Sequence, residues 1–176
     1  MSYEQIFDRL FQTKSTHTGG TRPTLDNAYA LDRALGFPST FYSTVHIAGS
    51  NGKGSVTTKI AKALEFSGYR VGIYTSPHLF SFRERIAINS ELISEEEVAE
   101  GLKQIFSIAD SLNLNATFFE LTTFLAFDYF RRKSVDIVVV ETGLGGRCDA
   151  TNVIRPELAV ITSISRERSG PTWANA

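Results

Sequence analysis

A glycine-rich segment, Gly49-Ser-Asn-Gly-Lys-Gly-Ser55, restricts the fold more than any other feature, because it joins a β-rich run to a helical one. Residues 44–48 (TVHIA) favour a strand, and residues 55–67 favour a helix that ends at Gly68. Residues 70–75 (RVGIYT) favour a second strand. This order is typical of a βαβ crossover, so an α/β fold on a mostly parallel sheet is predicted.

The rest of the chain supplies further elements for such a sheet. The apolar run at 135–140 is expected of a central parallel strand, and residues 158–164 are another β-rich run. The segment RERIAINSELI fits a small hairpin that turns at Asn89-Ser90. Helices are predicted at 3–12, 25–36, 94–112 and 119–132, with a loop at 15–24. The predicted fold class is therefore a doubly wound, P-loop NTPase-like sheet flanked by helices.

Composition excludes several classes of protein. Lys+Arg 18 and Asp+Glu 19 leave a net charge of −1, which argues against a nucleic-acid binder. The longest apolar run has four residues, too few for a membrane helix, and the N-terminus lacks a signal-peptide pattern. Cys148 is the single cysteine, so a disulfide framework and a multi-cysteine metal site are excluded. A cytoplasmic location, with no membrane partner, is expected.

The glycine-rich segment has the physical properties of a phosphate cradle. Glycines let successive backbone N–H groups point inward, and the N-terminus of the following helix adds partial positive charge. Lys53 can reach phosphates and Ser55 can bind Mg²⁺, although Gly54 breaks the usual P-loop spacing. The alternative is an ordinary glycine-rich turn. The predicted ATP-binding residues are Gly49, Asn51, Gly52, Lys53, Gly54 and Ser55.

Polar residues also follow two other predicted strands. Glu141 comes directly after the 135–140 run, where a carboxylate would face the ligand crevice and could hold Mg²⁺. The alternative is a surface glutamate. Ser76, after the 70–75 run, could lie near the metal. His78 could orient a ligand or act as a cap, and Arg85 could bind an acidic substrate or remain solvated.

The remaining candidates carry weaker signals. The GLGGR segment (143–147) has two interpretations. Its glycines could bring the backbone close to another group, with Arg147 and Asp149 supplying charge nearby, or the segment could simply be a tight turn. His46 lies within a strand and is interpreted as a satisfied core histidine. Cys148 is interpreted as a small packing residue, because no base can be assigned to it. No role is assigned to His17.

Four stretches, in this order, resemble the N-terminal part of the folylpolyglutamate synthase/dihydrofolate synthase family, within the Mur ligase superfamily. They are HIAGSNGKGSV (46–56), YTSPHLFSFRERIAI (74–88), FFELTTFLAF (118–127) and VVVETGLGGRCDATNVI (138–154). The resemblance extends from about residue 25 to Ile164 and includes the extra Gly54 of the phosphate loop. The resemblance therefore implies the Mur ligase central domain as the fold.

The resemblance also implies a reaction and roles. ATP would convert a substrate carboxylate to an acyl phosphate, and glutamate would displace the phosphate to form an amide on dihydropteroate or folate. A carboxylate is a poor electrophile and needs such a leaving group. Cations must also neutralise the negative charge that develops at the site. The catalytic residues that the resemblance implies are Lys53, Glu141 and His78. The implied Mg²⁺ ligands are Ser55, Ser76 and Glu141. The implied substrate-binding residues are Phe119, Arg85, Arg147, Asp149 and Ala150.

The resemblance stops after Ile164. Arg168 stands where the family places a metal-binding histidine, and the family's C-terminal domain has no counterpart. We therefore expect an incomplete ATP-binding domain at 1–164 and a divergent tail at 165–176. Such a chain would be an inactive fragment prone to self-association, whereas the full-length enzyme would be a monomer. Three alternatives remain: a non-catalytic MgATP-binding module, a muramyl-peptide ligase relative, and a generic P-loop NTPase.

Overall fold

The computed structural model describes residues 3–13 and 24–165. Its helices are α1 (Tyr3–Gln12), α2 (Asp26–Ala34), α3 (Lys53–Phe66), α4 (Glu95–Ser111) and α5 (Phe118–Arg132). Its strands are β1 (Ser43–Ala48), β2 (Val71–Tyr74), β3 (Ile86–Ile88), β4 (Glu91–Leu92), β5 (Ile137–Glu141) and β6 (Leu158–Ile161). Three short 3-10 helices connect them: η1 (Pro38–Phe41), η2 (Phe82–Arg85) and η3 (Ala150–Val153).

The strands form one mixed sheet in the order β4-β3-β2-β5-β1-β6. The four strands β2, β5, β1 and β6 are parallel, and the β3–β4 hairpin is added antiparallel to β2. Ile47 of β1 is level with Glu141 of β5, so the carboxyl ends of these two strands meet at one edge. The predicted mostly parallel α/β sheet is confirmed.

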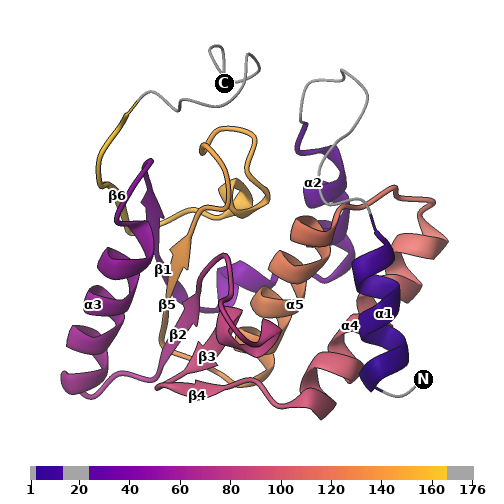
Figure 1. The fold of residues 1–176 in the computed structure, drawn as a ribbon, viewed down its shortest axis with the longest axis horizontal. Helices are drawn as coiled ribbons and strands as arrows, with labels where there is room; N and C mark the ends of the chain where they lie inside the picture. Colours follow the sequence, from indigo (N-terminus) through magenta and orange to yellow (C-terminus); the bar gives the residue numbers. More distant parts are fainter. Residues whose placement is uncertain (1–2, 14–23, 166–176) are drawn as a thin grey trace.

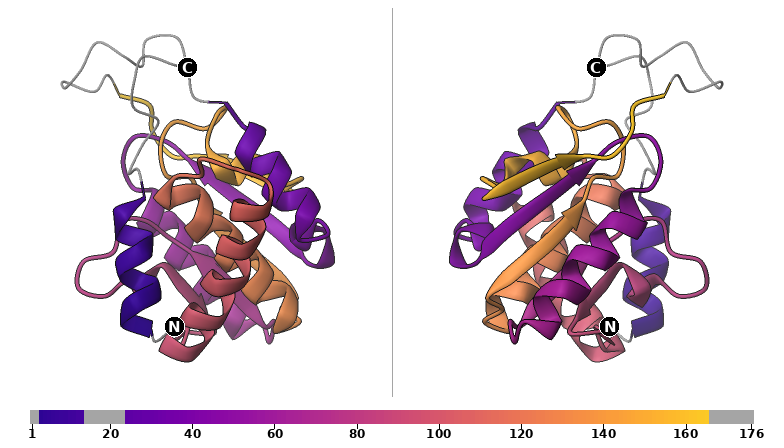
Figure 2. Two further views of the ribbon diagram at one scale, coloured as in Figure 1. Left: turned by 90° about the vertical axis from the view of Figure 1, so that its right-hand side faces the viewer. Right: turned by 90° about the vertical axis from the view of Figure 1, so that its left-hand side faces the viewer.

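Helices cover both faces of this sheet, as a doubly wound architecture requires (Figure 1). Helix α3 packs on one face against β1, β2 and β5, whereas α5 lies on the opposite face beneath α4, α1 and α2. The two side views place β6 at the rim of the sheet beside β1 (Figure 2). This topology brings the loops after β1, β2 and β5 to the same end of the molecule.

Two hydrophobic clusters hold the layers together. The larger one joins α5, α4, α2 and α1 to the sheet, and its centre includes Phe124, Phe127 and Phe130, which have no exposed surface. The smaller one lies under α3 and includes Ile47 and Val139. Helix α5 is apolar over most of its surface because both the sheet and α4 pack against it. Helix α5 thus carries the centre of the core.

The predicted helices and strands are confirmed, with small shifts at their ends, whereas the loop predicted at 15–24 lies outside the described residues except for Thr24. Helix α3 begins at Lys53, two residues earlier than predicted, so Lys53 and Gly54 belong to its first turn. The hairpin turns at Asn89 and Ser90, which both have positive φ angles, as expected of a type I′ turn. Strand β6 ends at Ile161 instead of 164. Within the described residues, no helix has the length and apolar character to cross a membrane.

Candidate functional site

The segment Gly49–Ser55, called the glycine loop below, connects the carboxyl end of β1 to the N-terminus of α3. The backbone takes positive φ angles at Gly49 (+137°) and Gly52 (+80°), which only glycine adopts easily. Lys53 donates from Nζ to the backbone carbonyl of Gly49 at 2.9 Å, so its ammonium folds back over the loop. A helix N-terminus, an adaptable backbone and an ammonium therefore meet here, and this is the chemistry of an anion site.

The segment 162–165, which follows β6, holds the glycine loop from the side. Ser50 donates its backbone N–H to the carbonyl of Ser163 at 2.6 Å, and Thr162 donates its hydroxyl to the carbonyl of Asn51 at 2.7 Å. The Asn51 amide in turn donates to the hydroxyl of Ser165 at 3.3 Å. These hydroxyl residues were missed by the sequence analysis. The only available signal was their position at the end of the strand predicted at 158–164.

Glu141 ends β5 next to the start of α3, and its carboxylate is buried. An ideal Cβ placed on Gly54 would lie 3.6 Å from Glu141 Oε2, so this carboxylate faces the glycine loop. The backbone N–H of Ser76 donates to the same oxygen at 3.1 Å. Burial raises the pKa of Glu141, whereas the Ser76 N–H and the positive charges of Lys53 and Arg85 oppose that rise. A cation beside Glu141 would favour its ionised form.

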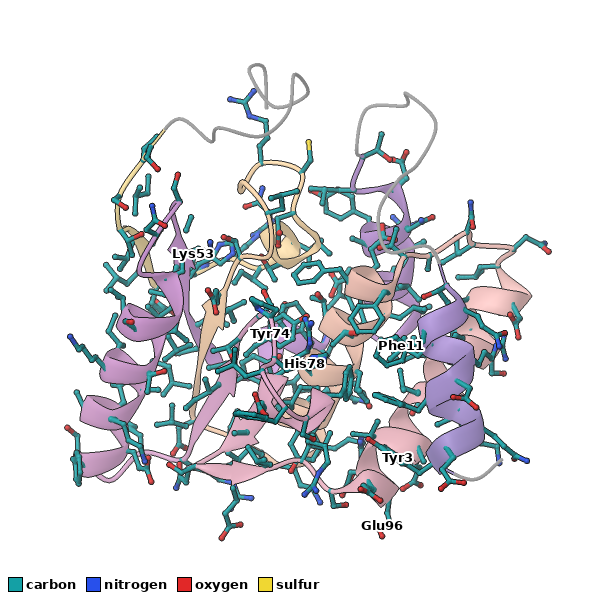
Figure 3. All side chains as sticks on the ribbon, viewed as in Figure 1. Tyr3, Phe11, Lys53, Tyr74, His78 and Glu96 are labelled. Atoms are coloured by element: carbon teal, nitrogen blue, oxygen red, sulfur yellow. The ribbon has the colours of Figure 1, made fainter. Side chains whose placement is uncertain are left out.

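The segment after β2 brings His78 and Arg85 together. Glu84 organises this segment, because its carboxylate accepts backbone N–H groups from Leu79, Phe80 and Ser81. Arg85 Nε then donates to His78 Nδ1 at 2.8 Å. Burial and the positive charge of Arg85 lower the pKa of His78. Figure 3 marks Lys53 at the start of α3, Tyr74 at the end of β2, and His78 on the segment that follows.

An aromatic group lies between these polar residues and the N-terminus of α5. The rings of Tyr74 and Phe119 have centroids 6.0 Å apart, and Phe119 also lies against the backbone of Gly143. A Cβ on Gly143 would come within 2.5 Å of Phe119 Cζ, so glycine is needed at that position. The close backbone approach predicted for the GLGGR segment is thus confirmed for Gly143. Phe119 is half-buried and reaches this site from α5.

Asp149 and Ala150 are buried beside the GLGGR turn. Asp149 accepts the backbone N–H of Leu144 at 2.8 Å and that of Thr151 at 3.0 Å, so its carboxylate fixes the turn and caps η3. Arg147 is exposed, and its side chain has no hydrogen bond or ion pair within the described part of the chain. The structure therefore brings Asp149 to the site but does not join Arg147 to the other predicted residues.

Two further interpretations from the sequence can be checked. His46 is buried, and its Nε2 lies 2.8 Å from the hydroxyl of Thr151, which confirms a satisfied core histidine. Cys148 is exposed, so its interpretation as a packing residue is wrong. The sequence could not show this, because the turn around it projects away from the core. His17, Arg168 and almost all of the predicted tail lie outside the described residues.

Comparison with known proteins was made by sequence and by structure. No protein-family model matches the chain. Dihydrofolate synthase/folylpolyglutamate synthase of Bacillus subtilis (strain 168) is 42% identical over 153 residues, which cover 84% of this chain and 36% of the relative. The crystal structure of Thermotoga maritima folylpolyglutamate synthase superposes with a TM-score of 0.86 at 42% identity, over 93% of this chain and 38% of that one. A folylpolyglutamate synthase–AMPPCP–folate complex gives 0.87 at 35%, over 96% and 42%.

The fold and the site together define the class of this chain: an α/β domain with a P-loop-like glycine loop facing a buried carboxylate across the carboxyl edge of its sheet. Within that class, the chain belongs to the folylpolyglutamate synthase/dihydrofolate synthase family of Mur ligases. It spans about two fifths of the length of the relatives it matches. The predicted family and fold are therefore confirmed, whereas the individual site residues stay predictions.

Proposed function

We propose that this chain binds MgATP at the carboxyl edge of its sheet. The observation that carries this proposal is the meeting of the glycine loop with Glu141, whose Oε2 would lie 3.6 Å from a Cβ on Gly54. Backbone N–H groups and Lys53 would hold the phosphates. The relative solved with AMPPCP, an ATP analogue, and folate supports this assignment. The proposed nucleotide-binding residues are Gly49, Asn51, Gly52, Lys53, Gly54 and Ser55.

The residues at this edge fit a magnesium ion held mainly by phosphate oxygens. Mg²⁺ prefers hard oxygen ligands and uses one or two carboxylates together with phosphate and water. Glu141 supplies the carboxylate, and Ser55 and Ser76 supply hydroxyls. No group of three acidic, histidine or cysteine side chains that could hold a metal by itself occurs among the described residues. We therefore assign Mg²⁺ to Glu141, Ser55 and Ser76, where it would neutralise phosphate charge when bound.

We further propose that the whole protein is an ATP-dependent ligase that adds glutamate to dihydropteroate or folate. An acyl phosphate on the substrate carboxylate would provide the leaving group that amide formation needs. Phe119, with Asp149 and Ala150, would line the pterin pocket, and Arg147 could reach the substrate from its exposed turn. Lys53 would hold the transferred phosphate, and His78 would orient the substrate. The names and ligands of the relatives support this reading.

The division of the chain also remains a proposal. Residues 1–164 would be an ATP-binding domain, and catalysis would require further residues, because the relatives are about two and a half times as long. The alternative is a non-catalytic MgATP-binding module. A muramyl-peptide ligase is less well supported, since the matched relatives act in folate metabolism by name. A cytoplasmic location likewise stays a prediction.

One experiment tests whether the 176 residues bind nucleotide and whether they suffice for ligation. The 176-residue chain is incubated with MgATP, dihydropteroate and labelled glutamate, and the labelled amide is measured. We expect nucleotide binding without amide formation from this chain, in line with the shorter length. Amide that depends on all three substrates would show that these residues suffice for ligation. If the chain melts cooperatively, and is therefore folded, but binds no nucleotide, both the ligase proposal and the MgATP-binding module are contradicted.

A further inference from the structure

Asp149 is a buried carboxylate that hydrogen-bond donors alone hold in place. It is 5% exposed, and among the described residues no Lys, Arg or His side chain forms an ion pair with it. Its Oδ2 accepts the backbone N–H of Leu144, and its Oδ1 accepts both the backbone N–H and the hydroxyl of Thr151. A buried carboxylate without a cation depends on such donors. Two of the three come from Thr151, so the placement of Asp149 depends on that residue.

The Thr151 hydroxyl has one proton to donate, and Asp149 takes it. The distance from Thr151 Oγ1 to Asp149 Oδ1 is 2.5 Å, a length typical of a hydrogen bond to an ionised carboxylate. Because such a carboxylate only accepts, the 2.8 Å contact between Thr151 Oγ1 and His46 Nε2 must use a proton on the imidazole. His46 therefore donates to Thr151, and Thr151 donates to Asp149. These three residues are called the His46 network below.

Strand β1 gives His46 a fixed place in this network. Side chains alternate along a strand, so His46 points to the face of the sheet opposite to Val45 and Ile47, which pack in the cluster under α3. Burial lowers the pKa of His46, whereas the negative charge of Asp149 opposes that change. The neutral ring then carries its single proton on Nε2. Since β1 continues into the glycine loop, the network fixes Asp149 relative to the strand that leads to that loop.

We propose that His46 is a positioning residue for Asp149 and acts through the hydroxyl of Thr151. This role rests on the proposed function, in which Asp149 lines the substrate pocket. An ionised carboxylate has about four lone-pair sites, and three are filled here, so about one remains for a ligand that donates an N–H group. His46 fixes the direction of that remaining site. Loss of its donated proton should weaken binding of the pterin substrate and leave nucleotide binding unchanged.

The test compares His46→Gln with His46→Leu in the 176-residue chain. Glutamine supplies an amide N–H in place of the imidazole Nε2–H, whereas leucine supplies no donor. Dihydropteroate is titrated into each protein in the presence of Mg²⁺ and AMPPCP. His46→Leu should bind it about threefold to tenfold more weakly than the wild type, as expected for one lost hydrogen bond, and His46→Gln should stay within about twofold. The affinity for MgAMPPCP should be the same in all three proteins.

Thr44→Val is the matched control. Thr44 lies on the same face of β1 as His46 and is 2% exposed, but its hydroxyl lies 3.5 Å from the carbonyl of Arg155 instead of contacting the His46 network. This variant also removes one buried polar group from the strand. It should bind dihydropteroate as tightly as the wild type does.

Equal weakening by His46→Leu and His46→Gln, or by His46→Leu and Thr44→Val, would overturn the positioning role, because His46 would then serve only the packing of β1. Unchanged binding by His46→Leu would overturn it as well. Two measurements need no ligand. Imidazole ¹⁵N shifts should place the His46 proton on Nε2, and a proton on Nδ1 contradicts the network. Exchange of the Leu144 amide with solvent should be faster in His46→Leu but not in His46→Gln, and equal rates contradict the network too. A wild type that passes both measurements but binds no dihydropteroate would contradict the proposed substrate pocket instead.

Discussion

Gly49 is the residue whose identity the glycine loop depends on most. Its φ of +137° is strained for any other residue, and an added Cβ would lie 2.1 Å from Thr162 Oγ1. Gly49→Ala should therefore displace the 162–165 segment and the loop together. We expect a loss of stability of about 1–3 kcal/mol and at least about tenfold weaker MgATP binding, measured by denaturant unfolding and by calorimetry.

Gly146→Ala is the matched control, since this glycine has an ordinary φ and open space around its Cβ position. It should change the free energy of unfolding by no more than about 0.5 kcal/mol. Comparable losses for the two variants would show that the close contact between Gly49 and Thr162 is unimportant.

Asp32 predicts a dependence of stability on pH. It is buried in α2, its Oδ1 has no hydrogen-bond partner, and burial raises its pKa to about 6. The folded state therefore holds this proton more tightly than the unfolded state does. The contribution of this bound proton to the stability of the folded state is complete below pH ~4 and is lost as the pH rises to about 6.

Asp32→Asn should relieve that cost above pH 6. We expect unfolding at pH 7 to need about 2–3 kcal/mol more free energy than in the wild type, from the size of this pKa shift. At pH 4 the difference should be much smaller, because Asp32 is then protonated in the folded state and close to half-protonated in the unfolded state. Urea unfolding at both pH values checks this. If the gain in stability of Asp32→Asn over the wild type is no larger at pH 7 than at pH 4, the assignment of a raised pKa to Asp32 is refuted.

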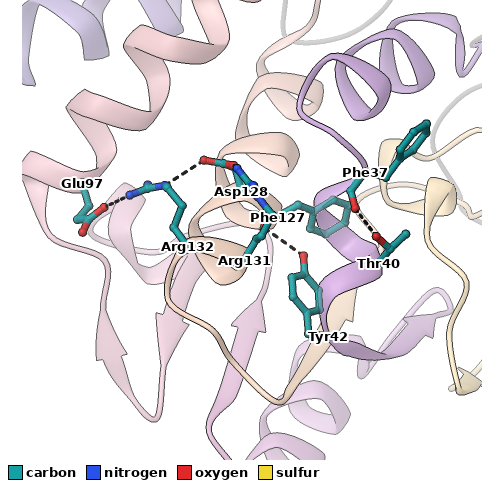
Figure 4. Close-up of polar contacts among 8 residues, drawn as sticks. All are labelled: Phe37, Thr40, Tyr42, Glu97, Phe127, Asp128, Arg131 and Arg132. Carbon is teal, nitrogen blue, oxygen red and sulfur yellow. Dashed lines mark hydrogen bonds and ion pairs between the residues drawn. The ribbon is translucent and has the colours of Figure 1, made fainter.

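Helix α5 is fixed at its C-terminal end by one buried carboxylate. Asp128 is 2% exposed and accepts hydrogen bonds from Arg131 at 2.6 Å and from Arg132 at 3.0 Å (Figure 4). Arg132 also reaches Glu97 of α4 at 2.7 Å, and Tyr42 donates to the carbonyl of Phe127. These bonds tie α5 to α4 and to the segment before β1. The element that supplies Phe119 is thereby held in place at its other end.

Asp128→Asn should destabilise the protein by about 1.5–3 kcal/mol, because it weakens charge-assisted hydrogen bonds at a buried acceptor. Asp110→Asn is the control: that carboxylate pairs with Arg9, but its side chain is 62% exposed, so the loss should be about 0.2–1 kcal/mol. Chemical unfolding of both variants gives the comparison. Similar losses of unfolding free energy in the two variants would mean that the burial of Asp128 adds nothing to its contribution to stability.

The sequence sufficed to predict the elements because their signals are local. The apolar runs that precede Gly49–Ser55 and Gly143–Arg147 located β1 and β5, and the helical pattern at 94–112 located α4. The support of the glycine loop by residues 162–165 could not be predicted, because it joins segments more than 100 residues apart. The Arg85–His78 contact was likewise hidden, since it depends on how Glu84 folds its own loop.

At the scale of the whole molecule, the two edges of the sheet differ. Strand β4 has two residues and includes Glu91, whereas β6 exposes Leu158 (53%) and Ile161 (66%). Among the described strands β6 pairs only with β1, and α3 covers β1, β2 and β5 instead. An exposed apolar edge strand offers free N–H and C=O groups to another chain. We therefore predict concentration-dependent self-association of the 176-residue chain.

Sedimentation over a wide concentration range tests this. Leu158→Lys should shift the protein toward the monomer, because a charge on an edge strand opposes pairing. Phe66→Lys makes the same type of change at the end of α3, where the side chain is 89% exposed, and should leave association unaltered. A wild-type chain that stays monomeric and melts cooperatively would contradict the prediction.

The central claim is that the glycine loop and Glu141 form a preformed MgATP site. Calorimetric titration of the 176-residue chain with MgATP tests it most directly, beside Lys53→Ala and the control Lys59→Ala, an exposed lysine of the same helix. We predict binding by the wild type and the control, and at least about tenfold weaker binding by Lys53→Ala, or about 1.4 kcal/mol. A circular dichroism melt confirms that each sample is folded. A folded wild type that binds no MgATP, or a Lys53→Ala variant that binds it equally well, would contradict the account.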